Sequence, residues 1–155
     1  MSEVDIQTDL QRELLNLTSI FQTGDVTIGD WSILDGSSAN APYAIIEMAD
    51  DFSVSGAQSE WNGTTSIPFT LIVKFIDWDT SMLAFRDLRQ SVIDALKSTM
   101  YYNSSSVTLG WGLRSIASAS GIDPVYDRYE ANPSESIPIF LSQRIILEVE
   151  ETSEA

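Results

Sequence analysis

The chain has 155 residues, 43% of them hydrophobic, which suits one domain with one core. Its 23 acidic and 8 basic residues give a formal charge of -15, which argues against bare nucleic acid and anionic membranes as partners. Because the chain has no Cys and no His, a disulfide framework, a thiolate metal site and a Ser–His–Asp triad are excluded, and we expect no cofactor and no metal. Without a signal peptide or a bilayer-spanning apolar run, we expect a soluble protein made in a cytoplasm.

The first predicted element is an amphipathic helix from Val4 to Phe21, where apolar residues recur at helical spacing. Gly24 is the expected stop just beyond it. A strand-like stretch follows around Val26 to Leu34. After a loop of small residues, Pro42 to Met48 is predicted to be a strand, with its proline at the entry where no ladder hydrogen bond is lost.

The strongest predicted strand runs from Ile67 to Trp78, and apolar residues on both of its faces predict a central position in a sheet. Before it, a strand starting at Phe52 leads into a long polar tip, Ser55 to Thr65. After it, Asp79 or Thr80 caps a helix that runs to about Ser98. Its inner face is expected to carry Phe85, Leu88, Val92 and Leu96, and its outer face Arg86, Asp87, Arg89, Gln90 and Asp94.

Three strands are predicted in the last third of the chain. The first spans Val107 to Ala119, with Gly110 and Gly112 marking a bulge and with Leu113 and Ser115 on one side. A short edge strand is expected at Val125 to Tyr129, and a long final strand at Ile137 to Glu150.

These elements predict one α+β domain over residues 1–150, followed by a flexible acidic tail, residues 151–155. We expect a largely antiparallel mixed sheet of four to six strands with two helices packed on one face and one long β-arm.

Ionisable residues that could carry chemistry have ordinary structural interpretations. Asp50 and Asp51 resemble a turn, and Asp79 resembles a helix cap, so a carboxylate-based hydrolase is the weaker interpretation of these acids. Lys74 lies in an apolar strand but has no companion nucleophile or base, so we expect it to reach solvent or an acid. The sequence therefore predicts a protein that is not an enzyme.

Two loops have the composition of a binding surface. Trp61 in the polar tip is a candidate anchor, although it could instead fold back onto its own sheet. The loop from Ser120 to Ser136 carries residue types that are enriched at interfaces. An acidic subunit needs its few cations at contacts, although each cation could equally form a local salt bridge. The candidate subunit-interface residues are Glu60, Trp61, Asn62, Arg86, Arg89, Arg114, Tyr126, Arg128 and Tyr129, with Arg144 a further cation.

The order of elements resembles the tail terminator, or tail-completion, proteins of long-tailed bacteriophages. The resemblance rests on the N-terminal helix, a Pro-aromatic-apolar strand at Ala41–Glu47, a polar arm, and the strand Phe69–Asp77 that leads into a helix at Met82–Leu96. The final strand, Ile139–Glu150, closes the pattern. The strong acidity and the long segment Asp25–Asn40 depart from it.

The resemblance implies a ring of subunits, commonly six, that caps the tail tube and joins it to the head, without catalysis. The implied partners are copies of the chain itself, the tail tube protein, a neck or connector protein and, where one exists, a sheath protein. The implied location is the virion, after assembly in the host cytoplasm. DNA would pass through the lumen without specific binding, and acids lining the lumen would repel its phosphates.

Two alternatives stay open beside this interpretation. A head-side neck or connector subunit has the same general pattern. A free acidic protein that mimics DNA and occupies a basic partner belongs to another class, but it would place its acids in rows on one face, whereas here they scatter through caps, turns and both termini.

Overall fold

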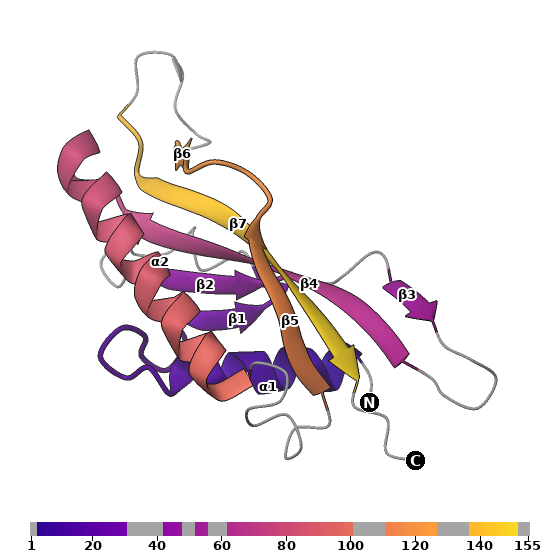
Figure 1. Ribbon diagram of the computed structural model, residues 1–155. Helices are drawn as coiled ribbons and strands as arrows, with labels where there is room; N and C mark the ends of the chain where they lie inside the picture. The colour runs from indigo at the N-terminus through magenta and orange to yellow at the C-terminus, as the bar shows by residue number, and fades with distance from the viewer. Residues whose placement is uncertain are drawn as a thin grey trace.

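Two helices cover one face of a mixed, largely antiparallel and open sheet in the computed structural model (Figure 1), which confirms the expected α+β class. The structure describes residues 3–30, 42–47, 52–55, 62–100, 111–126 and 137–151. The elements are α1 (Glu3–Leu15), β1 (Val26–Ile28), β2 (Tyr43–Ile46), β3 (Phe52–Ser55), β4 (Asn62–Lys74), α2 (Trp78–Met100), β5 (Trp111–Ser118), β6 (Asp123–Val125) and β7 (Phe140–Glu151).

The sheet is built around β4, as the apolar residues on both of its faces predicted. The strand order is β1-β2-β4-β7-β5, with β3 paired to β4 and β6 paired to β7. Among the described strands, β1 and β2 pair in parallel and the other pairs are antiparallel. The longest ladder joins β4 to β7, from Thr64 opposite Glu150 to Lys74 opposite Phe140.

The main core lies between the sheet and the two helices. Phe69 and Leu71 of β4 face it and are fully buried, together with Leu10 of α1 and Phe85 of α2. The predicted inner face of α2 is confirmed, because Phe85, Leu88, Val92 and Leu96 all belong to this cluster. Its burial supplies the main driving force for holding both helices on the sheet.

The opposite face of the sheet carries a second, smaller apolar cluster. It consists of Tyr43, Ile45, Ile72 and Phe140, with Val125 of β6 packed against it. The Tyr43 and Phe140 rings meet edge to face, with centroids 6.2 Å apart. Further along this face the residues are polar: Glu47 accepts a hydrogen bond from Arg144 and lies 3.5 Å from the Thr70 hydroxyl.

The first helix is shorter than predicted, because α1 ends at Leu15 rather than Phe21. Tighter turn hydrogen bonds follow, such as Leu17 N to Leu14 O (3.1 Å), where Thr18 and Ser19 favour turns over helix. Phe21 is still buried although it lies beyond the helix, so its spacing from the other apolar residues indicated a buried position and not a helical one. The predicted stop, Gly24, is a turn residue before β1 with φ of 94°, a conformation that suits glycine.

The second helix begins earlier than predicted, and its cap is Asp77 rather than Asp79 or Thr80. Asp77 Oδ1 accepts a hydrogen bond from Thr80 N (2.8 Å), the geometry of an N-cap. Ser81 adds a link to the preceding strand, because its Oγ accepts a bond from Ile76 N (2.8 Å). Trp78 therefore belongs to the helix and not to the strand before it.

Strand β5 has a bulge at Arg114; of the glycines predicted to mark one, Gly112 pairs regularly with Glu150 and Gly110 lies outside the described residues. Leu113 pairs with Val149 and Ser115 pairs with Glu148, which leaves Arg114 as the extra residue. The bulge turns Leu113 into the main core while Ser115 bonds to Glu148 on the opposite face, so these two residues do not share a side as predicted.

Other predicted boundaries shift by a few residues. β4 begins at Asn62, within the predicted polar tip, because residues 62–65 pair with β3. β1 ends at Ile28, where Gly29 adopts φ of 70°. β6 covers Asp123–Val125 and so begins two residues before the predicted start, while residues 127–129 of that predicted strand lie outside the described residues. β7 takes in Glu151 from the predicted tail. The remaining tail, residues 152–155, and the acids Asp50 and Asp51 lie outside the described residues.

Candidate protein-binding surface

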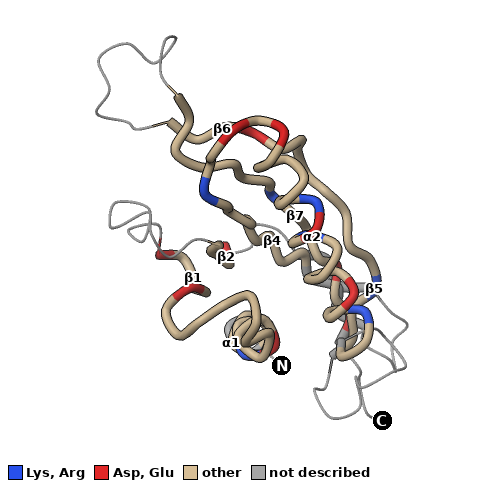
Figure 2. Tube along the Cα trace, turned by 90° about the vertical axis from the view of Figure 1, so that its left-hand side faces the viewer, with Lys and Arg blue, Asp and Glu red and all other residues tan. Residues whose placement is uncertain are grey.

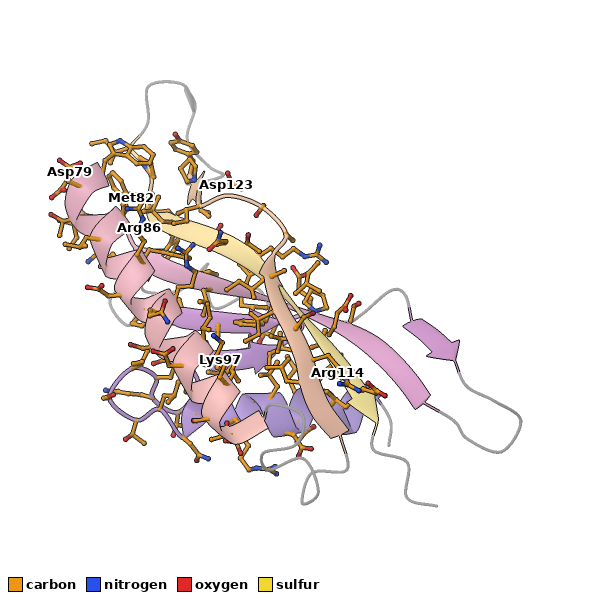
Figure 3. All side chains as sticks on the ribbon, viewed as in Figure 1. Asp79, Met82, Arg86, Lys97, Arg114 and Asp123 are labelled. Atoms are coloured by element: carbon orange, nitrogen blue, oxygen red, sulfur yellow. The ribbon has the colours of Figure 1, made fainter. Side chains whose placement is uncertain are left out.

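Exposed apolar side chains gather at one end of the molecule. We call this the end surface and define it as Ile76, Trp78, Tyr126, Ile137 and Ile139. They come from the turn between β4 and α2, the start of α2, the end of β6 and the approach to β7. Side chains crowd this end of the ribbon near the labelled Asp79, Met82 and Asp123 (Figure 3).

Backbone hydrogen bonds hold these segments next to one another. Phe75 N donates to Ile139 O (2.9 Å), and Ile139 N donates to Val125 O (2.9 Å). The Phe75 ring also meets the Trp78 ring edge to face, with centroids 5.1 Å apart. Each residue of the end surface is therefore at most three residues along the chain from Phe75, Val125 or Ile139, whose backbone hydrogen bonds join the three segments.

Three large apolar side chains of the end surface are at least half exposed to solvent. Ile137 is 74% exposed, Ile76 70% and Trp78 51%. Isolated exposed apolar residues are normal, but a cluster is typical of a protein-binding site. Trp and Tyr are also the residue types that most often anchor interfaces.

Charged residues around the end surface are mostly acidic. Asp77 and Asp79 flank Trp78, and Asp123 starts the strand that leads to Tyr126; all three are exposed. The described cations toward this end are Lys74, at the end of β4, and Arg86 of α2 (Figure 3). Thr80 lowers the pKa of Asp77, chiefly through its backbone N–H and then through its hydroxyl, so this carboxylate stays ionised at neutral pH.

A second surface lies on the outer face of α2. Leu83 is 63% exposed, and Arg86 follows it by three residues, so the two side chains are neighbours on the helix. Within the described part of the chain, ion pairs involve Arg12, Arg114 and Arg144, whereas Lys74, Arg86 and Lys97 are exposed and form none there. Arg86 is therefore a cation available for an intermolecular contact.

The structure places the sequence-predicted interface residues in several different settings. Glu60, Trp61, Arg128 and Tyr129 lie outside the described residues. Asn62 pairs with Ser55 in the β3–β4 hairpin, and Tyr126 belongs to the end surface.

Three of the predicted contact cations make bonds within the chain. Arg89 is half-buried and not on the outer face as predicted, because its Nη1 donates to Gln143 Oε1 of β7 (2.8 Å). Arg114 pairs with Glu150, and Arg144 pairs with Glu47 at 2.7 Å. Their role in subunit contacts stays a prediction, but these bonds match the alternative of local salt bridges.

Sequence reasoning missed most of the end surface. The predicted strand Ile67–Trp78 includes Trp78, and the predicted strand Ile137–Glu150 includes Ile137 and Ile139, so neither prediction indicates an exposed surface. One signal is present: Ile76 and Trp78 are large apolar residues that alternate with Asp77 and Asp79 where the predicted strand meets the predicted helix.

Of the ionisable residues considered for chemistry, the structure describes Lys74 and Asp79 but not Asp50 or Asp51. Lys74 is exposed at the end of β4, as expected. No group of three or more potential metal ligands occurs among the described residues. None of the described helices is both long and apolar enough to span a membrane. No protein-family model and no curated protein matches the chain.

Proposed function

We propose that this chain is a structural subunit that assembles into a ring, terminates a bacteriophage tail tube and joins it to the head or neck. The order of elements that resembles tail terminator proteins supports this proposal. The observation that carries it is the exposed apolar end surface on an otherwise strongly acidic chain, because such a surface suits a protein that completes its task by docking.

A ring of this kind needs contacts of two types. Lateral contacts join neighbouring copies head to tail, through two different surfaces of each subunit. Axial contacts join the ring to the tube below it and to the neck above it. We assign the lateral contact to Leu83 and Arg86, because an exposed apolar side chain there lies next to a cation that forms no ion pair with the described residues.

The distribution of charge supports a ring subunit over a DNA mimic. A mimic needs carboxylates in rows on one face, but the described acids are spread over α1, α2, the β1 region and β6 (Figure 2). A head-side connector is the close variant of the proposal, because it would use the same two types of contact.

Light scattering coupled to size-exclusion chromatography tests the ring. We expect the mass to rise with concentration toward about six copies. Arg86→Glu should lower the mass at a given concentration, whereas Lys97→Glu, an identical charge change at the far end of α2, should not. A monomer at every concentration, or equal effects of the two variants, would contradict the proposed lateral contact.

A further inference from the structure

We infer that the end surface binds a different protein, whose docking surface has an apolar centre with lysines or arginines around it, and that it does not bind a second copy of this chain. The inference deepens the proposed function, because it assigns this surface to the axial partner of the ring. Its basis is the combination of exposed apolar side chains with surrounding carboxylates.

The end surface exposes large apolar side chains that a partner would bury. Ile137, Ile76 and Trp78 are each more than half exposed. The Trp78 ring is already supported on one side by Phe75, so little conformational freedom remains to be lost when a partner covers it. A supported aromatic ring beside aliphatic side chains has the composition of an interface hot spot.

The charges around the end surface determine which kind of partner can bind there. Among the described residues, the carboxylates Asp77, Asp79 and Asp123 outnumber the cations Lys74 and Arg86 at this end of the molecule (Figure 3). Two copies that met through their end surfaces would bring these carboxylates together, and like charges at an interface are costly. A partner with cations at its rim would instead gain attraction and a faster association rate.

The chain has few cations to offer as its own partner. Of its 8 basic residues, Arg12, Arg114 and Arg144 are in ion pairs and Arg89 is bonded to Gln143. Lys74, Arg86 and Lys97 form no ion pair with the described residues and are spread over the end of β4 and the length of α2, and Arg128 lies outside the described residues. Two end surfaces therefore do not complement each other, and the lateral surface, Leu83 with Arg86, offers one such cation against the three described carboxylates. The charges point to a different partner that carries more cations.

Binding of a synthetic peptide tests this inference. The probe is a short amphipathic helix with a Leu and Trp stripe and lysines elsewhere, and binding is measured by fluorescence anisotropy of a label on the peptide. Two control peptides carry glutamates in place of the lysines, or serines in place of the apolar stripe. We expect only the basic amphipathic peptide to bind, with an affinity that falls as salt is raised.

Variants then locate the binding site. Ile137→Ser should weaken binding about tenfold, whereas Leu83→Ser, an equal loss of an exposed apolar side chain on α2, should leave it within about twofold. Trp78→Ser serves as a second variant of the end surface. The pair Asp79→Asn with Asp123→Asn should weaken binding more than Asp87→Asn with Asp94→Asn, which changes the net charge equally.

Three results would overturn the inference. They are equal effects of Ile137→Ser and Leu83→Ser, equal effects of the two acidic pairs, or binding of the glutamate peptide. Loss of assembly mass in Ile137→Ser alone would also overturn it, because the surface would then hold copies of the chain. Failure of the chain to assemble into a ring is a separate result, because the peptide can bind a monomer. Arg86→Glu tests ring assembly without any peptide.

Discussion

The hydrogen bond between Arg89 and Gln143 ties α2 to the centre of the sheet, and removing it should be measurable. Gln143 is 4% exposed; it accepts from Arg89 Nη1 (2.8 Å), and its Nε2 donates to Ser120 O (2.9 Å). We consider Gln143→Leu, which keeps a side chain of similar size and leaves no cavity. The change removes both bonds and leaves the half-buried guanidinium of Arg89 without its acceptor.

The expected cost follows from these two bonds. A hydrogen bond to a charged group contributes about 1.5–3 kcal/mol and a neutral one about 0.5–1.5 kcal/mol. Both lost partners keep some access to water, because Arg89 is half-buried and Ser120 is exposed, so the lower values apply. The loss is therefore about 2 kcal/mol, and better burial of the leucine reduces it to about 1–2 kcal/mol.

A double-mutant cycle separates the bond from other effects. Replacing both partners by apolar residues removes the unpaired charge, so Arg89→Leu with Gln143→Leu should recover about 1 kcal/mol relative to the sum of the single changes. Urea unfolding followed by circular dichroism measures each free energy of unfolding. Arg86→Leu with Gln143→Leu is the matched control and should show no coupling. A coupling below about 0.3 kcal/mol for the Arg89 pair would refute the reasoning.

Three further predictions follow from the same contacts. Leu10→Ala should lower the free energy of unfolding by about 2–5 kcal/mol in urea, because Leu10 is fully buried where α1 meets the core. Arg144→Ala should cost less than about 1 kcal/mol in the same assay, since its ion pair with Glu47 is partly exposed and screened by solvent. Asp77→Asn should be less stable than the natural chain at neutral pH and equally stable at acid pH. The folded-state pKa of Asp77 is lowered, so its contribution is present above the unfolded-state pKa and is lost as the pH falls through the folded value. Thermal unfolding of both proteins across this pH range would check it. Because asparagine keeps a capping oxygen, a difference that persists at low pH would contradict the proposed contribution of the Asp77 charge.

Local sequence patterns determined much of the architecture. The two faces of Phe69 to Val73 are apolar, which requires burial on both sides and hence a central strand with a covered reverse face. The spacing of Phe85, Leu88, Val92 and Leu96 identified the buried stripe of α2, because a helix repeats every 3.6 residues. The formal charge of -15 also indicated that the few cations would matter.

Only the tertiary structure decided where the chain exposes its apolar residues. Ile76, Tyr126 and Ile137 belong to separate segments, and they become neighbours because strand pairing brings the end of β4, β6 and the approach to β7 together. The same holds for Arg89, whose position on the helix suggested an outward direction until Gln143 of β7 supplied a buried acceptor. The periodicity of apolar side chains indicates the local secondary structure, whereas pairing between distant segments depends on the packing of the whole sheet.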